Sequence, residues 1–376
     1  MAIQAGLVGL PNVGKSTLFN ALTKSSVPAE NYPFCTIDPH VAITPVNDHR
    51  LDNLIKIFNS KKRVSATVQF SDIAGLVKGA ATGEGLGNQF LGHIIDVDLI
   101  LHVIRCFEND DITHVSQKID PLEDFEIVCA ELMLKDLESI EKREVKVLNI
   151  LKTSKNKNLS SQQINELEKE KKLIEEVKIA IQEGNLDKIY AIVKKYKKEN
   201  IKTISLLSAK NYLIIANFSE EDFQGKKYLN NINYKNLIKK FGQDKVIPVS
   251  AKIESEISQL KDEEKKEMLE SLEITESGLD NIIKKTYESL GLITFFTAGP
   301  TEAHAWSIKK NTNVVQAAGT IHSDMERGFI CAQIYNCKDI FELRNEPALK
   351  NAGKIRTEGK DYIVQNGDVL LIRFNV

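Results

Sequence analysis

Short apolar runs rich in β-branched residues alternate with amphipathic stretches over residues 1–134, and two more such runs follow after residue 210. This alternation predicts repeated strand–helix units, and therefore a mostly parallel sheet with helices on both faces. The gap before the last two runs indicates that a separate module is inserted into the sheet-forming sequence. The expected strands are Ile3–Val8, Val41–Thr44, Thr67–Phe70, Leu99–Ile104, Tyr212–Ala216 and Val246–Val249.

The inserted region, residues 135–200, has the pattern of an antiparallel helical hairpin that projects from the sheet domain. Apolar stripes beginning at Leu134, Leu167 and Ile189 predict three helices. The polar stretch Thr153–Ser161 predicts the turn, with Ser160 or Ser161 as helix N-cap. The region carries a local charge of +4. Such an arm is either a solvated helix with many ion pairs or a surface that contacts a partner, including RNA.

After residue 290 the pattern changes to a small β-rich domain of the ubiquitin-like α+β kind. Strands are expected over Ile293–Thr297, Gly328–Tyr335 and Tyr362–Phe374, around a short helix near Asn313–Ala318. Within the last of these segments, Asn366-Gly367-Asp368 is a turn signal before the strand Val369–Phe374. We therefore expect three parts: a sheet domain over 1–134 and 201–290, a helical coiled-coil insertion over 135–200 and a C-terminal domain over 291–376.

Composition narrows the class of protein. The 376 residues suffice for two or three modules, and a net charge of −2 argues against a wholly basic nucleic-acid binder. That value is a cancellation, because the sheet domain carries −7, the arm +4 and the C-terminal domain +1. Five cysteines without a C-x-x-C pair suggest neither a disulfide framework nor a zinc site. With no signal peptide or membrane-length apolar run visible, we expect a cytoplasmic protein that does not enter a membrane.

A phosphate-binding motif lies directly after the first expected strand. Gly9-Leu10-Pro11-Asn12-Val13-Gly14-Lys15-Ser16 matches G-x-x-x-x-G-K-[ST] and precedes an amphipathic run. Backbone N–H groups of such a loop surround phosphate oxygens, and the following helix adds a favourable dipole. Lys15 is expected to reach the β- and γ-phosphates of ATP or GTP and Ser16 to bind Mg²⁺. The expected nucleotide contacts in this loop are Asn12, Val13, Gly14, Lys15, Ser16 and Thr17.

Two further segments favour a GTPase-type switch over other P-loop proteins. Asp72-Ile73-Ala74-Gly75 follows the third expected strand, so that Asp72 can hold Mg²⁺ and the Gly75 N–H can sense the γ-phosphate. Thr36, between the two motifs, is the candidate for a second switch contact to Mg²⁺ and the γ-phosphate. Taken alone, Thr36 would be an ordinary loop hydroxyl, and only its position between these motifs gives it the switch role.

The base-recognition loops depart from the guanine-reading pattern N-K-x-D. After the fifth strand the chain reads Asn217-Phe218-Ser219-Glu220, so that Phe replaces Lys and the longer Glu replaces Asp. A displaced carboxylate loses the paired hydrogen bonds to guanine. The second loop, Ser250-Ala251-Lys252, is intact. We therefore predict that adenine is accepted and preferred, with Asn217, Phe218, Glu220, Ser250, Ala251 and Lys252 forming the base site.

The hydrolytic step also departs from the common pattern. Leu76 stands where related switches carry a water-orienting Gln, and an apolar side chain cannot orient water. His114, in a polar loop beyond the strand Leu99–Ile104, is a candidate to position water as a neutral imidazole. The simpler alternative is a solvated loop histidine. The glycine-rich segment Gly83–Asn88 suits an order–disorder transition.

Together these motifs resemble the YchF/Obg-like ATPase family of TRAFAC-type P-loop NTPases. The resemblance rests on residues 9–17, Tyr32–Pro39, 72–80, Arg105–Asp110, Asn217-x-x-Glu220 and the C-terminal module. It implies a Ras-like nucleotide domain, an inserted coiled-coil arm and a TGS domain. It also implies an ATPase that handles GTP, associates with ribosomes and carries an apolar residue at the position of Leu76. By the same resemblance, Phe218 packs near adenine and Asn12 helps to bind K⁺.

We therefore expect a Mg²⁺-dependent nucleoside-triphosphate hydrolase that works as a switch at the ribosome, with Lys15, Thr36, Gly75 and His114 as catalytic residues and Ser16, Thr36 and Asp72 as metal ligands. The alternative is a ribosome- or RNA-binding adaptor whose nucleotide site only tunes affinity. A small-molecule kinase is disfavoured, because the D-x-x-G and base loops point elsewhere.

Overall fold

The computed structural model describes residues 4–26, 40–73, 97–109, 119–153, 159–198, 205–274 and 276–375. The chain divides into two compact units, which are described separately. The first comprises residues 1–3, 22–70 and 274–376, and the second comprises residues 4–21 and 71–273. Within the described ranges, none of the helices combines the length and apolarity that a bilayer span requires.

A parallel sheet forms the centre of the second unit. Strands β1 (Gln4–Val8), β5 (Leu99–Arg105), β6 (Asn211–Asn217) and β7 (Val246–Val249) are hydrogen-bonded in that order, and each neighbouring pair is parallel. All seven residues of β5 are buried, as a strand covered on both faces requires. The expected parallel sheet is confirmed for these four strands.

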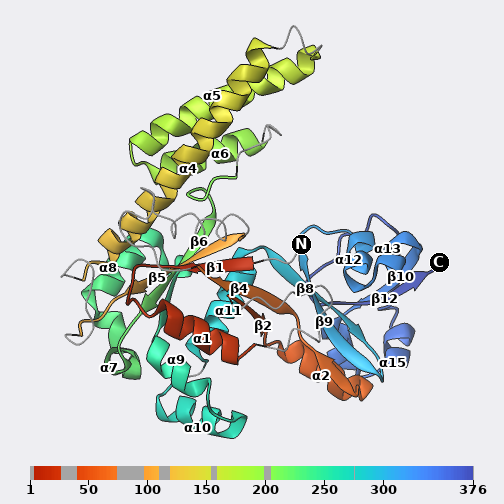
Figure 1. The fold of residues 1–376 in the computed structure, drawn as a ribbon. Coiled ribbons are helices and arrows are strands. Elements are labelled where there is room, and N and C mark those ends of the chain that lie inside the picture. Colours follow the sequence, from red (N-terminus) through yellow and green to blue (C-terminus); the bar gives the residue numbers. More distant parts are fainter. Residues whose placement is uncertain are drawn as a thin grey trace. The chain divides into compact units, whose positions relative to one another are not determined.

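Helices follow the strands of this unit as the alternating pattern predicts (Figure 1). After β1 comes α1 (Lys15–Lys24), whose last three residues belong to the first unit. The elements that follow β6 and β7 are α7 (Glu220–Phe223), η4 (Gln224–Asn230), α8 (Ile232–Phe241), η5 (Gln243–Lys245), α9 (Ala251–Ile257) and α10 (Asp262–Ser271).

The inserted arm contains the three expected helices, but its first helix begins earlier than the pattern predicted. They are α4 (Pro121–Lys152), α5 (Ser161–Gln182) and α6 (Leu186–Lys198), and α5 packs against both others (Figure 1). Asp120 caps α4 and Pro121 starts it, so its first turns cover β5 before it continues into the arm. Leu134, expected to start an apolar stripe, is instead 45% exposed.

Ser160 caps α5, as one of the two predicted alternatives. Its hydroxyl accepts the Gln163 N–H at 3.2 Å, and the Gln163 side chain accepts the Ser160 N–H at 2.9 Å. This reciprocal pair satisfies two backbone donors that a helix N-terminus otherwise leaves open.

The first unit is built on a second, mixed sheet with the strand order β11-β10-β12-β8-β9-β3. The strands are β3 (Lys62–Val64), β8 (Leu292–Ala298), β9 (Glu302–Lys309), β10 (Phe329–Asn336), β11 (Arg356–Glu358) and β12 (Asp368–Phe374). The unit also holds β2 (Val41–Pro45) beside β4 (Thr67–Asp72), whose last two residues belong to the second unit. Its helices are α2 (His49–Phe58), α11 (Gly278–Ser289), α12 (Val314–Ile321), α13 (Ser323–Arg327), α14 (Cys337–Leu343) and α15 (Glu346–Asn351).

Side chains on both faces of this second sheet are buried. Phe296 belongs to the cluster that includes Leu51 and Leu54 of α2, whereas its neighbour Phe295 belongs to the cluster that includes Val314 and Ala317 of α12. Successive strand residues point to opposite faces, so β8 contributes to both cores.

The strand expected over Tyr362–Phe374 is only partly correct. β12 begins at Asp368, because Gly367 takes a positive φ of 92° and forms the turn signalled by Asn366-Gly367-Asp368. Before this turn, Val364 donates its N–H to the Thr312 carbonyl at 3.1 Å, outside any named strand.

Candidate nucleotide-binding site

The loop between β1 and α1 has the backbone conformation of a tight phosphate-binding turn. Asn12 and Gly14 both have positive φ, 62° and 94°. Asn tolerates this left-handed region better than most residues, and Gly adopts it freely. A Cβ on Gly14 would collide with the Asn217 Nδ2, and one on Gly9 would lie 2.6 Å from the Val103 carbonyl oxygen. Glycine is therefore required at both positions by close packing.

Lys15 and Asp72 form an ion pair, joining the two motifs that lie 57 residues apart. Lys15 is the first residue of α1, and Asp72 is the last residue of β4. The side chains are 7% and 18% exposed. Ile73, directly after Asp72, donates its N–H to the Leu7 carbonyl of β1 at 3.2 Å, which fixes the Asp beside the loop. Ser16 and Thr17 are exposed in the first turn of α1.

Asn217 links the phosphate-binding loop to the second base loop. Its Nδ2 donates to the Val13 carbonyl at 2.9 Å, and its Oδ1 accepts the Ala251 N–H at 2.9 Å. The side chain is 3% exposed. Both hydrogen-bonding ends of this buried amide are therefore used to hold three segments together, a role that the sequence pattern alone did not show.

The two base loops also meet through their charged side chains. Lys252 donates to Glu220, and this hydrogen bond raises the pKa of Lys252. Glu220 and Lys252 remain 38% and 69% exposed. The carboxylate that replaces the guanine-reading Asp is thus held by the lysine of the Ser250-Ala251-Lys252 loop.

Phe218 and Ser250 lie inward from this surface. Phe218 is 1% exposed, with its ring centroid 5.5 Å from that of Tyr228 and 5.8 Å from that of Tyr234. The contact between Phe218 and adenine stays a prediction. Ser250 is fully buried, and its Oγ has no hydrogen-bond partner among the described residues.

Several predicted residues fall outside the part of the chain that the structure describes. They are Thr36, Gly75, Leu76, His114 and the segment Gly83–Asn88. Their switch and catalytic roles stay predictions.

One residue beside the site was quoted in the sequence pattern but given no role. Arg105 ends β5 and is 1% exposed. A charged residue at the end of a buried, largely apolar strand was the available signal, because such a group needs buried partners.

The strand–loop–helix with Lys15 against Asp72, together with the Asn217 and Ser250-Ala251-Lys252 loops, defines a P-loop nucleoside-triphosphate-binding protein of the GTPase type. Comparison with known families agrees. Residues 4–152 match the family model described as "50S ribosome-binding GTPase". Residues 292–375 match the model YchF-GTPase_C, described as "Protein of unknown function (DUF933)".

Similar proteins span the whole chain. The "Ribosome-binding ATPase YchF" of Bacillus subtilis (strain 168) is 46% identical over 376 residues, covering 100% of both chains. The "Obg-like ATPase 1" of Oryza sativa subsp. japonica is 43% identical, over 100% of this chain and 92% of the rice protein. The structure of the Schizosaccharomyces pombe YchF GTPase matches with a TM-score of 0.81 at 36% identity, covering 99% of this chain and 97% of that one. The chain belongs to the YchF/Obg-like ATPase family.

The predicted family and fold class are therefore confirmed: an α/β P-loop domain with a helical arm and a C-terminal α+β module.

Proposed function

We propose that this protein hydrolyses ATP, and GTP less well, and that it works as a nucleotide-dependent switch on ribosomes in the cytoplasm. The observation that carries the proposal is the buried pairing of Lys15 with Asp72 at the N-terminus of α1. A cation and a carboxylate beside a loop that has no room for a Cβ at Gly9 or Gly14 are the groups that a triphosphate with a divalent metal requires.

The residues present fit Mg²⁺ and a triphosphate. We assign Lys15 to the β- and γ-phosphates, with backbone N–H groups of residues 12–17 around the phosphate oxygens. Ser16, Thr36 and Asp72 would hold Mg²⁺, since hydroxyl and carboxylate oxygens suit this ion. When bound, Mg²⁺ neutralises charge on the phosphates. Thr36 and the Gly75 N–H would sense the γ-phosphate, His114 would orient water, and Asn12 would help to bind K⁺.

Adenine preference follows from the base loops. Glu220 is one methylene longer than Asp and is held by Lys252, so it cannot give guanine the paired hydrogen bonds that a correctly placed Asp provides. Asn217 keeps the base loops aligned with the phosphate loop, so both parts of the nucleotide are read by one connected framework.

Ribosome association is proposed from the relatives, since the bacterial one is named a "Ribosome-binding ATPase". We propose three functional parts: a nucleotide domain over 1–134 and 201–290, the arm over 135–200 and a TGS domain over 291–376. The net charge of +4 makes the arm the main candidate for contact with RNA, with the TGS domain as a second surface.

The experiment compares ATP turnover of the intact chain and of Lys15→Ala, with and without ribosomes. Loss of the phosphate-binding cation is expected to lower turnover by at least about a hundredfold. Lys24→Ala, at the exposed end of the same helix, is the matched control and is expected to turn over ATP normally.

Two results would contradict the proposal. Equal turnover by the Lys15→Ala variant would show that the P-loop is not the hydrolytic site. Nucleotide and ribosome binding without any hydrolysis would instead favour an adaptor whose nucleotide site only tunes affinity.

A further inference from the structure

Arg105 is among the largest fully buried side chains of the protein. It ends β5, at the carboxyl edge of the parallel sheet where ligands of such folds bind. Burying a guanidinium is costly unless its donors are hydrogen-bonded and its charge is balanced. The partners of Arg105 therefore indicate what the residue is retained for.

The guanidinium holds the short segment that directly follows it. Its Nε donates to the Phe107 carbonyl at 3.0 Å, and one terminal nitrogen donates to the Asn109 carbonyl at 3.1 Å. The charge also lies 4.8 Å from the centroid of the Phe107 ring. One side chain thus fixes two carbonyls and one aromatic ring, which the planar, forked geometry of Arg permits.

An acidic side chain on α4 balances the charge. Asp124, in the first turn of α4, is 2% exposed. Burial lowers the pKa of Arg105, and the charge of Asp124 raises it.

The held segment lies against the base loop. Cys106 donates its N–H to the Asn217 carbonyl at 2.9 Å, and its own carbonyl accepts from the Asn231 Nδ2 at 3.3 Å. Asn231 also caps α8 by accepting the N–H groups of Asn233 and Tyr234. Cys106 therefore joins the segment to Asn217, the residue that holds the phosphate-binding loop, and to the N-terminus of α8.

We propose that Arg105 is a positioning residue for base selection, because it holds residues 107–109 as one wall of the base site. This inference rests on the proposed nucleotide-binding function and deepens it. The wall would contact the base and not the triphosphate, since Cys106, the residue directly before it, is hydrogen-bonded to the backbone of Asn217 and to Asn231, the N-cap of α8.

The test uses the variant Arg105→Lys in the intact chain. It replaces the forked guanidinium by a single ammonium and keeps the positive charge near Asp124. Affinities for ATP, GTP and inorganic tripolyphosphate are measured. Loss of the two hydrogen bonds to the Phe107 and Asn109 carbonyls is expected to lower the affinity for ATP by about tenfold or more. It is also expected to reduce the ratio of ATP affinity to GTP affinity. Tripolyphosphate binding, which depends on the P-loop alone, is expected to be unchanged.

Arg143→Lys is the matched control. Arg143 forms a comparable forked pair with Glu170 in the arm, at 2.6 and 2.9 Å, and its replacement is expected to leave all three affinities unchanged. Phe107→Leu is the second variant, which leaves the buried charge intact. It is expected to show the same pattern, with ATP weakened and tripolyphosphate unaffected, and it decides the matter if Arg105→Lys does not fold.

An unchanged ATP affinity in a folded variant would overturn the inference. So would an equal loss for ATP and tripolyphosphate, because that is the pattern of a merely structural residue. Failure of the unaltered protein to bind ATP would instead refute the proposed function, so the two failures are distinguishable.

Discussion

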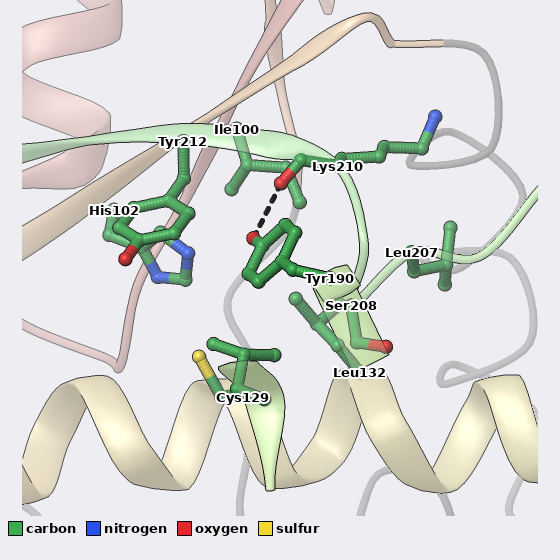
Figure 2. A pocket seen from close by; sticks show the side chains of 10 residues that line it. Ile100, His102, Cys129, Leu132, Tyr190, Leu207, Ser208, Lys210 and Tyr212 are labelled. Atoms are coloured by element: carbon green, nitrogen blue, oxygen red, sulfur yellow. Dashed lines mark hydrogen bonds between the residues drawn. The ribbon is translucent and has the colours of Figure 1, made fainter. Parts of the chain in front are cut away.

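The imidazole of His102 lies in an aromatic layer between β5, β6 and α4. Its ring centroid is 4.7 Å from that of Phe125 and 5.8 Å from that of Tyr212. It borders a cavity of about 10 Å³, enough for roughly one water molecule, which is also lined by Cys129 and Tyr190 (Figure 2). The Nδ1 atom has no hydrogen-bond partner among the described residues. Burial lowers the pKa of His102 from 6.5 to about 3.

This histidine should make stability depend on pH in a defined window. The unfolded chain binds a proton near pH 6.5, whereas the folded protein does not until about pH 3. Protons therefore favour unfolding between these values, and the free energy of unfolding falls with decreasing pH by up to ~1.4 kcal/mol per pH unit from this group.

His102→Phe is expected to remove that contribution, measured as the difference in slope between the two proteins in denaturant unfolding from pH 7 to pH 4. His49→Gln, at the exposed start of α2, is the matched control and should retain the original slope. Identical slopes for the original protein and His102→Phe would contradict the assignment.

At the scale of elements, α4 joins the sheet of the second unit to the arm as one helix of 32 residues. Midway along it, Asp136 is 1% exposed and accepts the N–H groups of Leu207 and Ser208, both at 2.8 Å, and the Ser208 hydroxyl at 2.6 Å. Burial raises the pKa of Asp136, and these hydrogen bonds lower it. The carboxylate thus fastens the chain leading into β6 to the base of the arm.

Asp136→Ala should be strongly destabilising, because it leaves three buried donors without their acceptor. A loss of about 3 kcal/mol in the free energy of unfolding is expected from equilibrium denaturation. Glu138→Ala, two residues away with a 41% exposed carboxylate paired to Lys135, should change it by less than about 0.5 kcal/mol. Equal effects of the two substitutions would show that Asp136 has no special role.

Much of the element pattern could be predicted because it is local. β7 agrees with its prediction, and β5 extends beyond its own predicted range by one residue, since both are mostly apolar runs. The start of α4 could not be predicted. Phe125 and Val128 are buried like residues of the sheet domain, and the helix has no break where the arm begins. The pairing of β3 with β9 joins residues 240 positions apart, as Lys62 opposite Glu302. A three-residue strand gives too short a pattern to predict such a partner.

In the candidate site, too, local motifs could be predicted from the sequence and contacts between distant residues could not. Lys15 and Asp72 could each be assigned to the triphosphate and its Mg²⁺ from the two motifs, whereas their direct ion pair is seen only in the structure. The linking role of Asn217 could not be predicted, since its partners Val13 and Ala251 are far away in the chain. The hydrogen bonds of Arg105 could not be predicted either, because its partners, the carbonyls of Phe107 and Asn109, depend on the conformation of residues 107–109.

For the molecule as a whole, the net charge of −2 is the sum of regions with opposite charge. The sheet-forming residues outside the arm and C-terminal region carry −7, and the arm carries +4. Long-range attraction to a polyanion therefore favours the arm over the rest of the chain. At the candidate site, Lys15 and Lys252 are each paired with a carboxylate, Asp72 and Glu220 respectively.

The chain combines a complete P-loop motif with base loops that depart from the guanine-reading pattern. The most direct test is the equilibrium affinity of the unaltered protein for ATP and for GTP, each with Mg²⁺. We expect ATP to bind at least as tightly as GTP, because Glu220 is one methylene longer than the guanine-reading Asp and is hydrogen-bonded by Lys252. GTP binding about tenfold or more tighter than ATP would contradict it.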